Sequence, residues 1–382
     1  MANQALIKRM NRARIMNALR LRSPISRSEL ADSLGLDRKS LTNIVFELLE
    51  EALVEEVGQT RQGRGRPRTL LELRRDTVSV LGVAIHEVGV DGVVADLYGA
   101  PRCSASASFS LGADFGVIKN ALSRVVGELC ESADPSPQRA GLVVPGIIDC
   151  GTGLVHRSVN LRALDGVNVR EQFQAILDVP LAIEEASRAK ALAEMWFGLA
   201  GDVSSFVCVD VGVGIGAGIV QDRRLYAGAS GYAGEIGHVV VEPNGRRCTC
   251  GHLGCLEAYV SDRVLLERIE EATGKASARL SKVDPSDSRV RQILEDAGHR
   301  LGLGLSTLVN ILCPPLIVVN GALMGFSDIV MRGVEKGLSE GALPACSERV
   351  RICPSGLTHA APLGAVAKAL ADFYEVDGHV YV

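Results

Sequence analysis

Three cysteines that fall within eight residues constrain the fold of this chain more than any other feature of its sequence. They occur in the segment GHVVVEPNGRRCTCGHLGCLE, where a histidine stands ten residues before the first cysteine. In a chain without a secretion signal, such a cluster favours a metal over a disulfide. Structural Zn²⁺ takes four such ligands in a tetrahedron, with no open position for catalysis, so the chain has to wrap around one point. We predict a structural zinc with the ligands His238, Cys248, Cys250 and Cys255, and His252 competes for the fourth position.

The charge is divided unevenly along the chain. Residues 1–75 hold 15 Lys and Arg but 9 Asp and Glu, whereas the whole chain holds 41 and 45. A basic N-terminal part before an acidic remainder indicates a polyanionic partner. The alternative is a solvated basic face, and charge alone does not decide between them.

The segment after Pro24 has the pattern of two short helices joined by a turn. Ser26 or Arg27 begins the first helix, Gly35 makes the turn, and Asp37 is placed to cap the second helix. The apolar residues of the second helix follow the 3.6-residue period and are expected to pack inward. They are Leu41, Ile44, Val45, Leu48 and Leu49. In this helix-turn-helix layout the first residues of the second helix face the bases. We predict DNA contacts by Arg38, Lys39, Ser40, Thr42 and Asn43.

The next two apolar segments, residues 53–57 and 69–73, are predicted to be strands. The segment GQTRQGRGRPR between them is a hairpin tip with four arginines and no acidic residue. Its core resembles the AT-hook, which lays arginines into the narrow minor groove of A·T-rich DNA. Arg64 and Arg66 are therefore predicted DNA contacts. We assign residues 1–75 to a winged helix-turn-helix domain that binds double-stranded operator DNA.

From Val78 onward, strand meanders alternate with helices twice over, which predicts an α/β protein with two related lobes. The glycine-rich turn at 210–218 follows a strand. It could cradle a phosphate with backbone N–H groups, or be a tight hairpin, and a strand after it argues against a dinucleotide fingerprint. The apolar runs are too short to span a membrane, and the N-terminus lacks a signal-peptide pattern, so we expect a cytoplasmic protein.

Three segments then resemble a known family. VDVGVGIGAGIV, GASGYAGEIGHV and CTCGHLGCLEAY closely resemble the signature of the ROK family of repressors, open reading frames and sugar kinases. The match extends from about Val78 to the C-terminus, and the winged helix in front resembles the repressor branch. The resemblance implies that residues 76–382 form a two-lobed, actin-like (ribonuclease-H-like) sugar-kinase fold. It also implies a sugar bound between the lobes, one structural zinc, and a homodimer or tetramer.

The resemblance also implies which residues contact the effector. The matching positions are Asn160, Glu235, His238 and Glu257. Carboxylates and amides suit paired sugar hydroxyls, and His238 could bind zinc through one nitrogen and face the sugar with the other. The alternative for Glu235 or Glu257 is a solvated charge.

Two departures separate this chain from the kinases that it resembles. Where those carry a D-x-G-G-T phosphate loop, this chain has residues 84–88, AIHEV, and Glu87 would repel a phosphate. Where they carry the general base, this chain has Ala186, and Glu185 beside it is turned by about 100° on a helix. Glu184, Glu185 or Arg188 is left to contact a different ligand.

The sequence therefore predicts a DNA-binding transcriptional regulator and not an enzyme. We expect a repressor controlled by a sugar or sugar-derived ligand, bound in a sugar-kinase-like domain without catalytic activity. The alternatives are an active sugar kinase with an accessory DNA-binding domain, and a regulator controlled by a partner protein.

Overall fold

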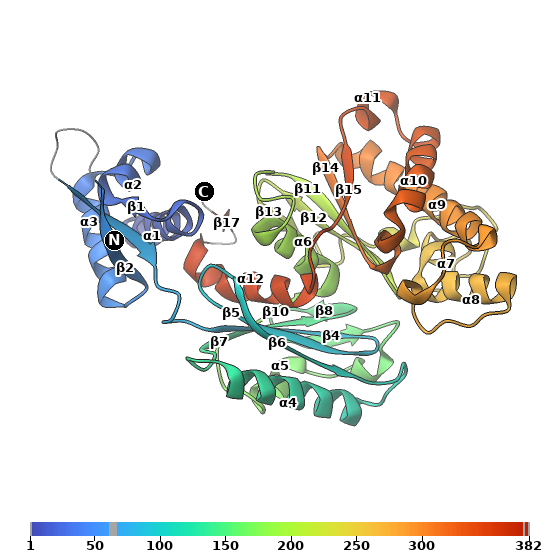
Figure 1. Ribbon diagram of the computed structural model, residues 1–382, viewed down its shortest axis with the longest axis horizontal. Helices are drawn as coiled ribbons and strands as arrows, with labels where there is room; N and C mark the ends of the chain where they lie inside the picture. Colours follow the sequence, from blue (N-terminus) through green and yellow to red (C-terminus); the bar gives the residue numbers. More distant parts are fainter. Residues whose placement is uncertain (1, 61–66, 377–378, 381–382) are drawn as a thin grey trace.

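The N-terminal part of the chain is a winged helix. The structure is a computed structural model that describes residues 2–60, 67–376 and 379–380. Three helices pack on a small antiparallel sheet with the strand order β1-β3-β2 (Figure 1). The elements are α1 (Ala2–Arg22), β1 (Ile25–Ser26), α2 (Arg27–Leu34), α3 (Arg38–Glu50), β2 (Val54–Thr60) and β3 (Arg68–Leu73). The predicted wing contacts Arg64 and Arg66 lie outside the described residues.

Local signals explain where these helices begin and end. Ser26 and Glu29 form a reciprocal capping box at the start of α2, and Gly35 ends that helix in the left-handed conformation with a φ of 62°. The Asp37 side chain accepts hydrogen bonds from the backbone N–H groups of Lys39 and Ser40, at 3.0 and 2.9 Å. The predicted inward residues of α3 are buried, except that Leu49 is half-buried. The polar N-terminal end of α3 therefore faces outward.

The remainder of the chain forms two lobes built on the same plan. The first sheet has the strand order β10-β7-β4-β5-β6 and the second β15-β14-β11-β12-β13. In each sheet three antiparallel strands are followed by two parallel ones. The predicted pair of related lobes, with the winged helix in front, is thus confirmed.

The first lobe contains the elements from β4 to β10, and α4 covers the outer face of its sheet (Figure 1). They are β4 (Val80–His86), β5 (Gly89–Ala95), β6 (Pro101–Ser108), α4 (Phe115–Ser132), β7 (Arg139–Val144), β8 (Ile147–Asp149), β9 (Leu154–Arg157), η1 (Arg162–Leu164), α5 (Val169–Gln174) and β10 (Leu181–Glu185).

The second lobe contains the elements from α6 to β15, and helix α12 and a two-stranded ribbon complete the described chain. They are α6 (Ala186–Phe197), β11 (Phe206–Val211), β12 (Ile215–Gln221), β13 (Arg224–Tyr226), η2 (Ile236–His238), α7 (Glu257–Val260), α8 (Asp262–Thr273), η3 (Leu280–Lys282), α9 (Ser288–Leu312), β14 (Leu316–Asn320), η4 (Ala322–Phe326), α10 (Ser327–Gly341), α11 (Pro344–Ser347), β15 (Arg351–Pro354), α12 (Ala360–Tyr374) and the ribbon of β16 (Glu375–Val376) and β17 (His379–Val380). None of the described helices is long and apolar enough to cross a membrane.

Helices α6 and α12 lie side by side between the two sheets. Helix α12 packs on the first sheet and α6 on the second. The packing is close because glycines stand at the contact points. A Cβ at Gly364 would overlap with the carbonyl of Ala189 on α6, and one at Gly141 would overlap with the backbone of Ala365 on α12. Helix α12 is therefore held between α6 and the first sheet with little room to move.

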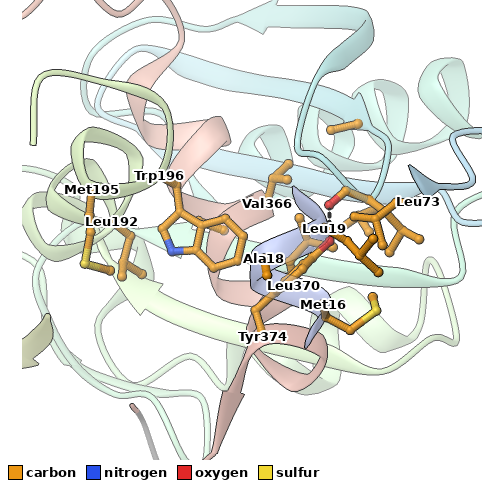
Figure 2. Close-up of a cluster of buried hydrophobic side chains, with 14 of the residues drawn as sticks. Met16, Ala18, Leu19, Leu73, Leu192, Met195, Trp196, Val366, Leu370 and Tyr374 are labelled. Carbon is orange, nitrogen blue, oxygen red and sulfur yellow. Dashed lines mark hydrogen bonds between the residues drawn. The ribbon is translucent and has the colours of Figure 1, made fainter. Parts of the chain in front are cut away.

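The winged helix shares one hydrophobic core with this helix pair. Side chains of α1, α6 and α12 lie in the same buried cluster (Figure 2). The Asn17 amide donates a hydrogen bond to the backbone carbonyl of Tyr374 at 2.7 Å, and the Tyr374 hydroxyl donates to the carbonyl of Leu97 at 2.5 Å. The Arg20 guanidinium lies 4.4 Å from the centroid of the Trp196 ring. The winged helix and the two lobes are thus packed as one body.

Candidate functional site

The predicted metal ligands converge on one point. One ligand atom from each of His238, Cys248, Cys250 and Cys255 lies within 4.8 Å of all the others. The Sγ atoms of Cys250 and Cys255 are 3.7 Å apart. A tetrahedral zinc with Zn–S bonds of about 2.3 Å requires a separation of about 3.8 Å between sulfurs. The donor set and its spacing therefore fit such an ion.

The chain wraps around this point at two glycines. Gly251 and Gly254 have positive φ angles of 100° and 80°, and a Cβ at Gly254 would overlap with the carbonyl of Glu242. His252 Nδ1 lies 3.5 Å from Cys250 Sγ, but His252 is not among the four ligands that converge. The geometry thus favours His238 over His252 as the fourth ligand.

Asn160 of the first lobe and Glu257 of the second lobe meet at the glycine-rich turn. A Cβ at Gly214 would lie 2.9 Å from Asn160 Nδ2 and 3.3 Å from Glu257 Oε2, so a glycine leaves room for both side chains. Glu257 accepts hydrogen bonds from the backbone N–H of Ile215 at 3.1 Å and from the hydroxyl of Thr249 at 3.2 Å. The turn is a tight hairpin between β11 and β12.

His238 connects the metal ligands to the predicted effector residues. Its Nδ1 lies 3.8 Å from Cys248 Sγ, and its Nε2 lies 3.8 Å from a carboxylate oxygen of Glu235. Burial raises the pKa of Glu235, while the charges of His238 and Arg188 act to lower it. The predicted effector residues thus lie around one region, and Arg188 lies close enough to act on it.

A cavity of about 510 Å³ opens where the first lobe, α6, α12 and the segment after β13 meet. The four predicted effector residues are not part of its wall. Its polar wall includes Cys150, His156, Glu184, Arg188 and Lys368. Sequence reasoning considered Glu184 and Arg188 only as open alternatives and missed the other three.

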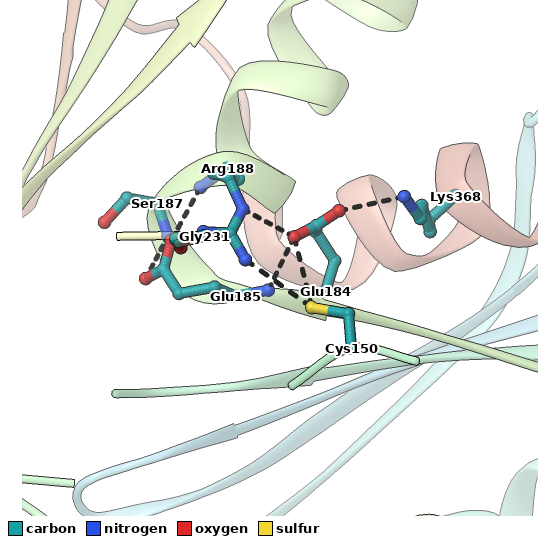
Figure 3. Close-up of polar contacts among 7 residues, drawn as sticks. All are labelled: Cys150, Glu184, Glu185, Ser187, Arg188, Gly231 and Lys368. Carbon is teal, nitrogen blue, oxygen red and sulfur yellow. Dashed lines mark hydrogen bonds and ion pairs between the residues drawn. The ribbon is translucent and has the colours of Figure 1, made fainter. Parts of the chain in front are cut away.

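Glu184 is the centre of a buried polar network on this wall (Figure 3). Its carboxylate accepts hydrogen bonds from Arg188 Nε at 2.7 Å and from the Glu185 backbone N–H at 3.0 Å, and it pairs with Lys368 Nζ at 2.9 Å. The Cys150 thiol donates to it at 3.6 Å. Burial acts to raise the pKa of Glu184, but Lys368 and Arg188 outweigh it and hold that pKa below its ordinary value. Glu184 is therefore a charged partner of both cations.

Glu185 caps a helix and is not free to act as a base. Its two carboxylate oxygens accept hydrogen bonds from the backbone N–H groups of Ser187 and Arg188, at 2.8 and 3.0 Å (Figure 3). Burial raises the pKa of this carboxyl. Ala186 at the first position of α6 has no side-chain group to accept a proton.

The β4–β5 turn brings a further carboxylate to the glycine-rich turn. Burial raises the pKa of Glu87, and the charge of Asp210 adds to this effect. Asp210 pairs with Lys190 at 2.6 Å. Burial, together with Asp210 and Glu87, raises the pKa of Asp262 to about 6. Three carboxylates around one lysine disfavour a bound phosphate.

The predicted DNA contacts of α3 lie on the surface. Arg38, Lys39, Thr42 and Asn43 are exposed, and Ser40 is half-buried. Beside them is a hollow of about 290 Å³, lined by hydroxyl and guanidinium groups. These groups belong to Ser26, Arg27, Ser28, Arg38, Thr42, Arg68 and Thr69. Such donors suit phosphate oxygens of a nucleic acid backbone.

Comparison with known proteins gives similarity over the whole chain. The model of the ROK family matches residues 116–371. The putative xylose repressor of Caldicellulosiruptor sp. (strain Rt8B.4) is 30% identical over 400 aligned residues, which cover 100% of both chains. The DNA-binding transcriptional dual regulator NagC of Escherichia coli K12 is 25% identical, covering 96% of this chain and 93% of its own. The fold is similar, with a TM-score of 0.81 and 24% identity, to a ROK family transcriptional regulator described as a homolog of the E. coli MLC protein, covering 96% of this chain and 98% of the other.

Proposed function

This chain belongs to the ROK family, and we propose that it is a transcriptional repressor that binds operator DNA and responds to a sugar-type ligand. The observation that carries the proposal is the core shared by the winged helix, α6 and α12. In this arrangement a domain with an exposed helix-turn-helix surface is packed against two helices that contribute side chains to a cavity between the lobes. Relatives that align over 96% or more of this chain are named xylose repressor or N-acetylglucosamine repressor, which supports this function.

The site supports binding of a sugar without its phosphorylation. Phosphoryl transfer requires positive groups on the transferring phosphate and a base for the attacking hydroxyl. Here Glu87 and Asp210 place negative charge beside the glycine-rich turn, Ala186 offers no base, and Glu185 is engaged at a helix N-terminus. The names of the full-length relatives also support a non-enzymatic role.

The metal that suits the cluster of His238, Cys248, Cys250 and Cys255 is zinc, bound structurally. When bound, it would hold the wrapped segment closed. The His238 ring would then stay fixed between that segment and Glu235, whose carboxylate faces Nε2.

Control of DNA binding follows from the position of the ligand region between the lobes. A ligand held by Asn160 of the first lobe and by Glu235, His238 and Glu257 of the second favours one relative placement of the lobes. Because the winged helix shares its core with the helices between the lobes, its position changes with them. In a homodimer or tetramer this alters the spacing of two DNA-binding surfaces, which must match half-sites one or more helical turns apart.

The direct test is fluorescence anisotropy with labelled DNA from upstream of the protein's own gene, with and without xylose, glucose or N-acetylglucosamine. We expect salt-sensitive binding to an inverted repeat with A·T-rich flanks, altered by one of these sugars or an acidic derivative. Replacing Arg64 and Arg66 by Ala should lower the slope of log affinity against log salt by roughly two if each contacts a phosphate. Equal affinity for unrelated DNA at every salt concentration, with no ligand effect, would contradict the proposal.

A further inference from the structure

Two cations on the cavity wall have more hydrogen-bond donors than their protein partners use. A guanidinium has five N–H donors and an ammonium three. The three nitrogens of Arg188 each make one bond, to Glu184 at 2.7 Å, to the carbonyl of Gly231 at 2.8 Å and to the Cys150 sulfur at 3.5 Å. Lys368 pairs with Glu184 at 2.9 Å. Among the described contacts, donors on both side chains are left for a ligand.

Two other carboxylates near these cations are engaged by backbone N–H groups. Asp149 accepts hydrogen bonds from the backbone N–H groups of Gly151 and Thr152, at 2.8 and 3.2 Å. Glu185 is bound to the N-terminus of α6. Glu184 is the carboxylate that pairs with both Arg188 and Lys368 among the described contacts, whereas Glu185 and Glu375 act on these cations through charge alone. Burial raises the pKa of both Glu185 and Glu375, which favours their neutral form. Two cations with spare donors therefore face one paired carboxylate at this wall. His156 also lies on this wall.

Burial strengthens the attraction of this wall for an anion. The Arg188 side chain is only 7% exposed and that of Lys368 35%. Charges interact more strongly where water is excluded, and a guanidinium can hold a carboxylate or phosphate with two parallel hydrogen bonds. A neutral hydroxyl uses the same donors but gains nothing from the charges of Arg188 and Lys368. The cavity, about 510 Å³ in volume, is in the size range of small-molecule sites and not of a macromolecular partner.

We propose that this cavity binds the acidic group of an anionic sugar derivative, with Arg188 and Lys368 as its ligands. The acidic group is an oxyanion, either the carboxylate of a sugar acid or the phosphate of a sugar phosphate. The inference rests on the proposed sugar response and specifies the chemical class of the effector. An anion that takes up donors of Lys368 also weakens the hold of this residue on Glu184, and so acts on α12.

The test is calorimetry on the full-length zinc-loaded protein with three matched pairs of ligands. They are xylose and xylonate, glucose and glucuronate, and N-acetylglucosamine and its 6-phosphate. We expect one acidic ligand to bind at least tenfold more tightly than its neutral parent, with an advantage that shrinks as salt is raised. The pair in which this occurs identifies a carboxylate or a phosphate as the recognised group.

Two variants test whether Lys368 and Arg188 cause the tighter binding of the acidic ligand. Lys368→Met removes the charge but keeps an apolar stem of similar length, and Glu184 keeps Arg188 as its partner. Arg188→Lys keeps the charge but removes the planar fork. Each variant should lower the affinity for the acidic ligand at least tenfold and the affinity for its neutral parent less than twofold. Lys119→Met is the control, because Lys119 lies on α4, on the other side of the first sheet from α12, and contacts Gln172; it should change neither affinity.

The outcomes separate this inference from the proposed function. If neutral sugars bind as tightly as their acidic partners, or if the variants weaken both members of a pair equally, the anion site is wrong and the sugar response stands. If no member of any pair binds, the proposed sugar response fails and this inference with it. Operator binding without ligand and thermal melting show whether the variants are folded, and Lys368→Met provides the test if Arg188→Lys does not fold.

Discussion

The contact between α1 and α12 allows a quantitative test of how the DNA-binding part is held. The Asn17 side chain is fully buried and donates to the Tyr374 carbonyl at 2.7 Å. Asn17→Ala removes this donor, and a buried group without a partner costs about 1–3 kcal/mol. The Asn17 Oδ1 atom itself has no partner among the described residues, so removing it offsets part of that cost. We expect a net loss of about 1 kcal/mol, roughly fivefold in the equilibrium between packed and separated states.

The protein contains its own reporter for this contact. Trp196 is the single tryptophan of the chain, and its ring lies 4.4 Å from the Arg20 guanidinium and 5.3 Å from the Tyr374 ring. Urea denaturation followed by tryptophan emission therefore reports on the junction, while circular dichroism of the same samples reports on the whole chain. Asn17→Ala should move the tryptophan transition to lower urea. It should also reduce the ratio of operator affinities measured with and without ligand.

Asn310→Ala is the matched control for this prediction. Asn310 is exposed, and like Asn17 it donates to a backbone carbonyl of another helix, that of Gly341 at 2.9 Å; its Oδ1 also accepts from the Leu343 N–H at 2.8 Å. It belongs to α9, outside the shared core. If Asn17→Ala moves the tryptophan transition no further than Asn310→Ala does, the bond to Tyr374 does not hold the two parts together, and the reasoning from the shared core is refuted.

Three further predictions concern the metal, the chemistry and the response to pH. Cys250→Ser should lower both the zinc content, to below about one per chain, and the melting temperature, because the free energy of metal binding stabilises the folded state. His252→Ala should retain the metal, and loss of zinc from this variant would show that His252 is the fourth ligand. A coupled assay with ATP, magnesium and sugars should show turnover far below about one per second, the low end of the usual kinase range. Turnover of about one per second or more would show that another carboxylate serves as the base. The pKa of Asp262 is raised to about 6 from 3.8, so the folded state binds the proton more tightly, and stability associated with this group is lost as pH rises from about 4 through 6. Asp262→Asn should therefore be more stable than the wild type at pH 8, by at most about 3 kcal/mol, with the difference vanishing near pH 4; a constant difference across this range would contradict the assignment.

Local signals in the sequence were sufficient for the winged helix and the metal ligands. Ser26 and Asp37 cap helices that begin at the next residue, because capping depends on side chains within three positions of the helix start. The cysteine cluster is likewise contained in a short segment, so its spacing alone predicted that the chain wraps around a metal position. Asn160 and Glu257 were predicted from the resemblance, and their approach at Gly214 depends on two lobes that sequence patterns do not place relative to each other.

The cavity wall could not be predicted for the same reason. Arg188 and Glu184 are four residues apart, but Glu184 lies in strand β10 and Arg188 in helix α6, so helix spacing did not predict their contact. Lys368 reaches Glu184 because the close packing at Gly141 brings α12 onto the first sheet, and the packing at Gly364 holds it against α6. Composition also divided the chain at residue 75, whereas the structure continues one core across that point.

Helix α12 connects the cavity wall to the winged helix over a short distance. Lys368 contacts Glu184 at the cavity, and six residues later the backbone carbonyl of Tyr374 accepts the hydrogen bond from Asn17. At 1.5 Å per residue the two contacts are about 9 Å apart along the axis of one helix. A helix of this length does not compress, and glycine contacts on two sides leave α12 little freedom to tilt. The two contacts therefore belong to one rigid element, so under the proposed function a change in the hold on Lys368 acts on the contact with α1 through the position of that element. Because such coupling is reciprocal, operator binding should change the affinity for the ligand by an equal factor.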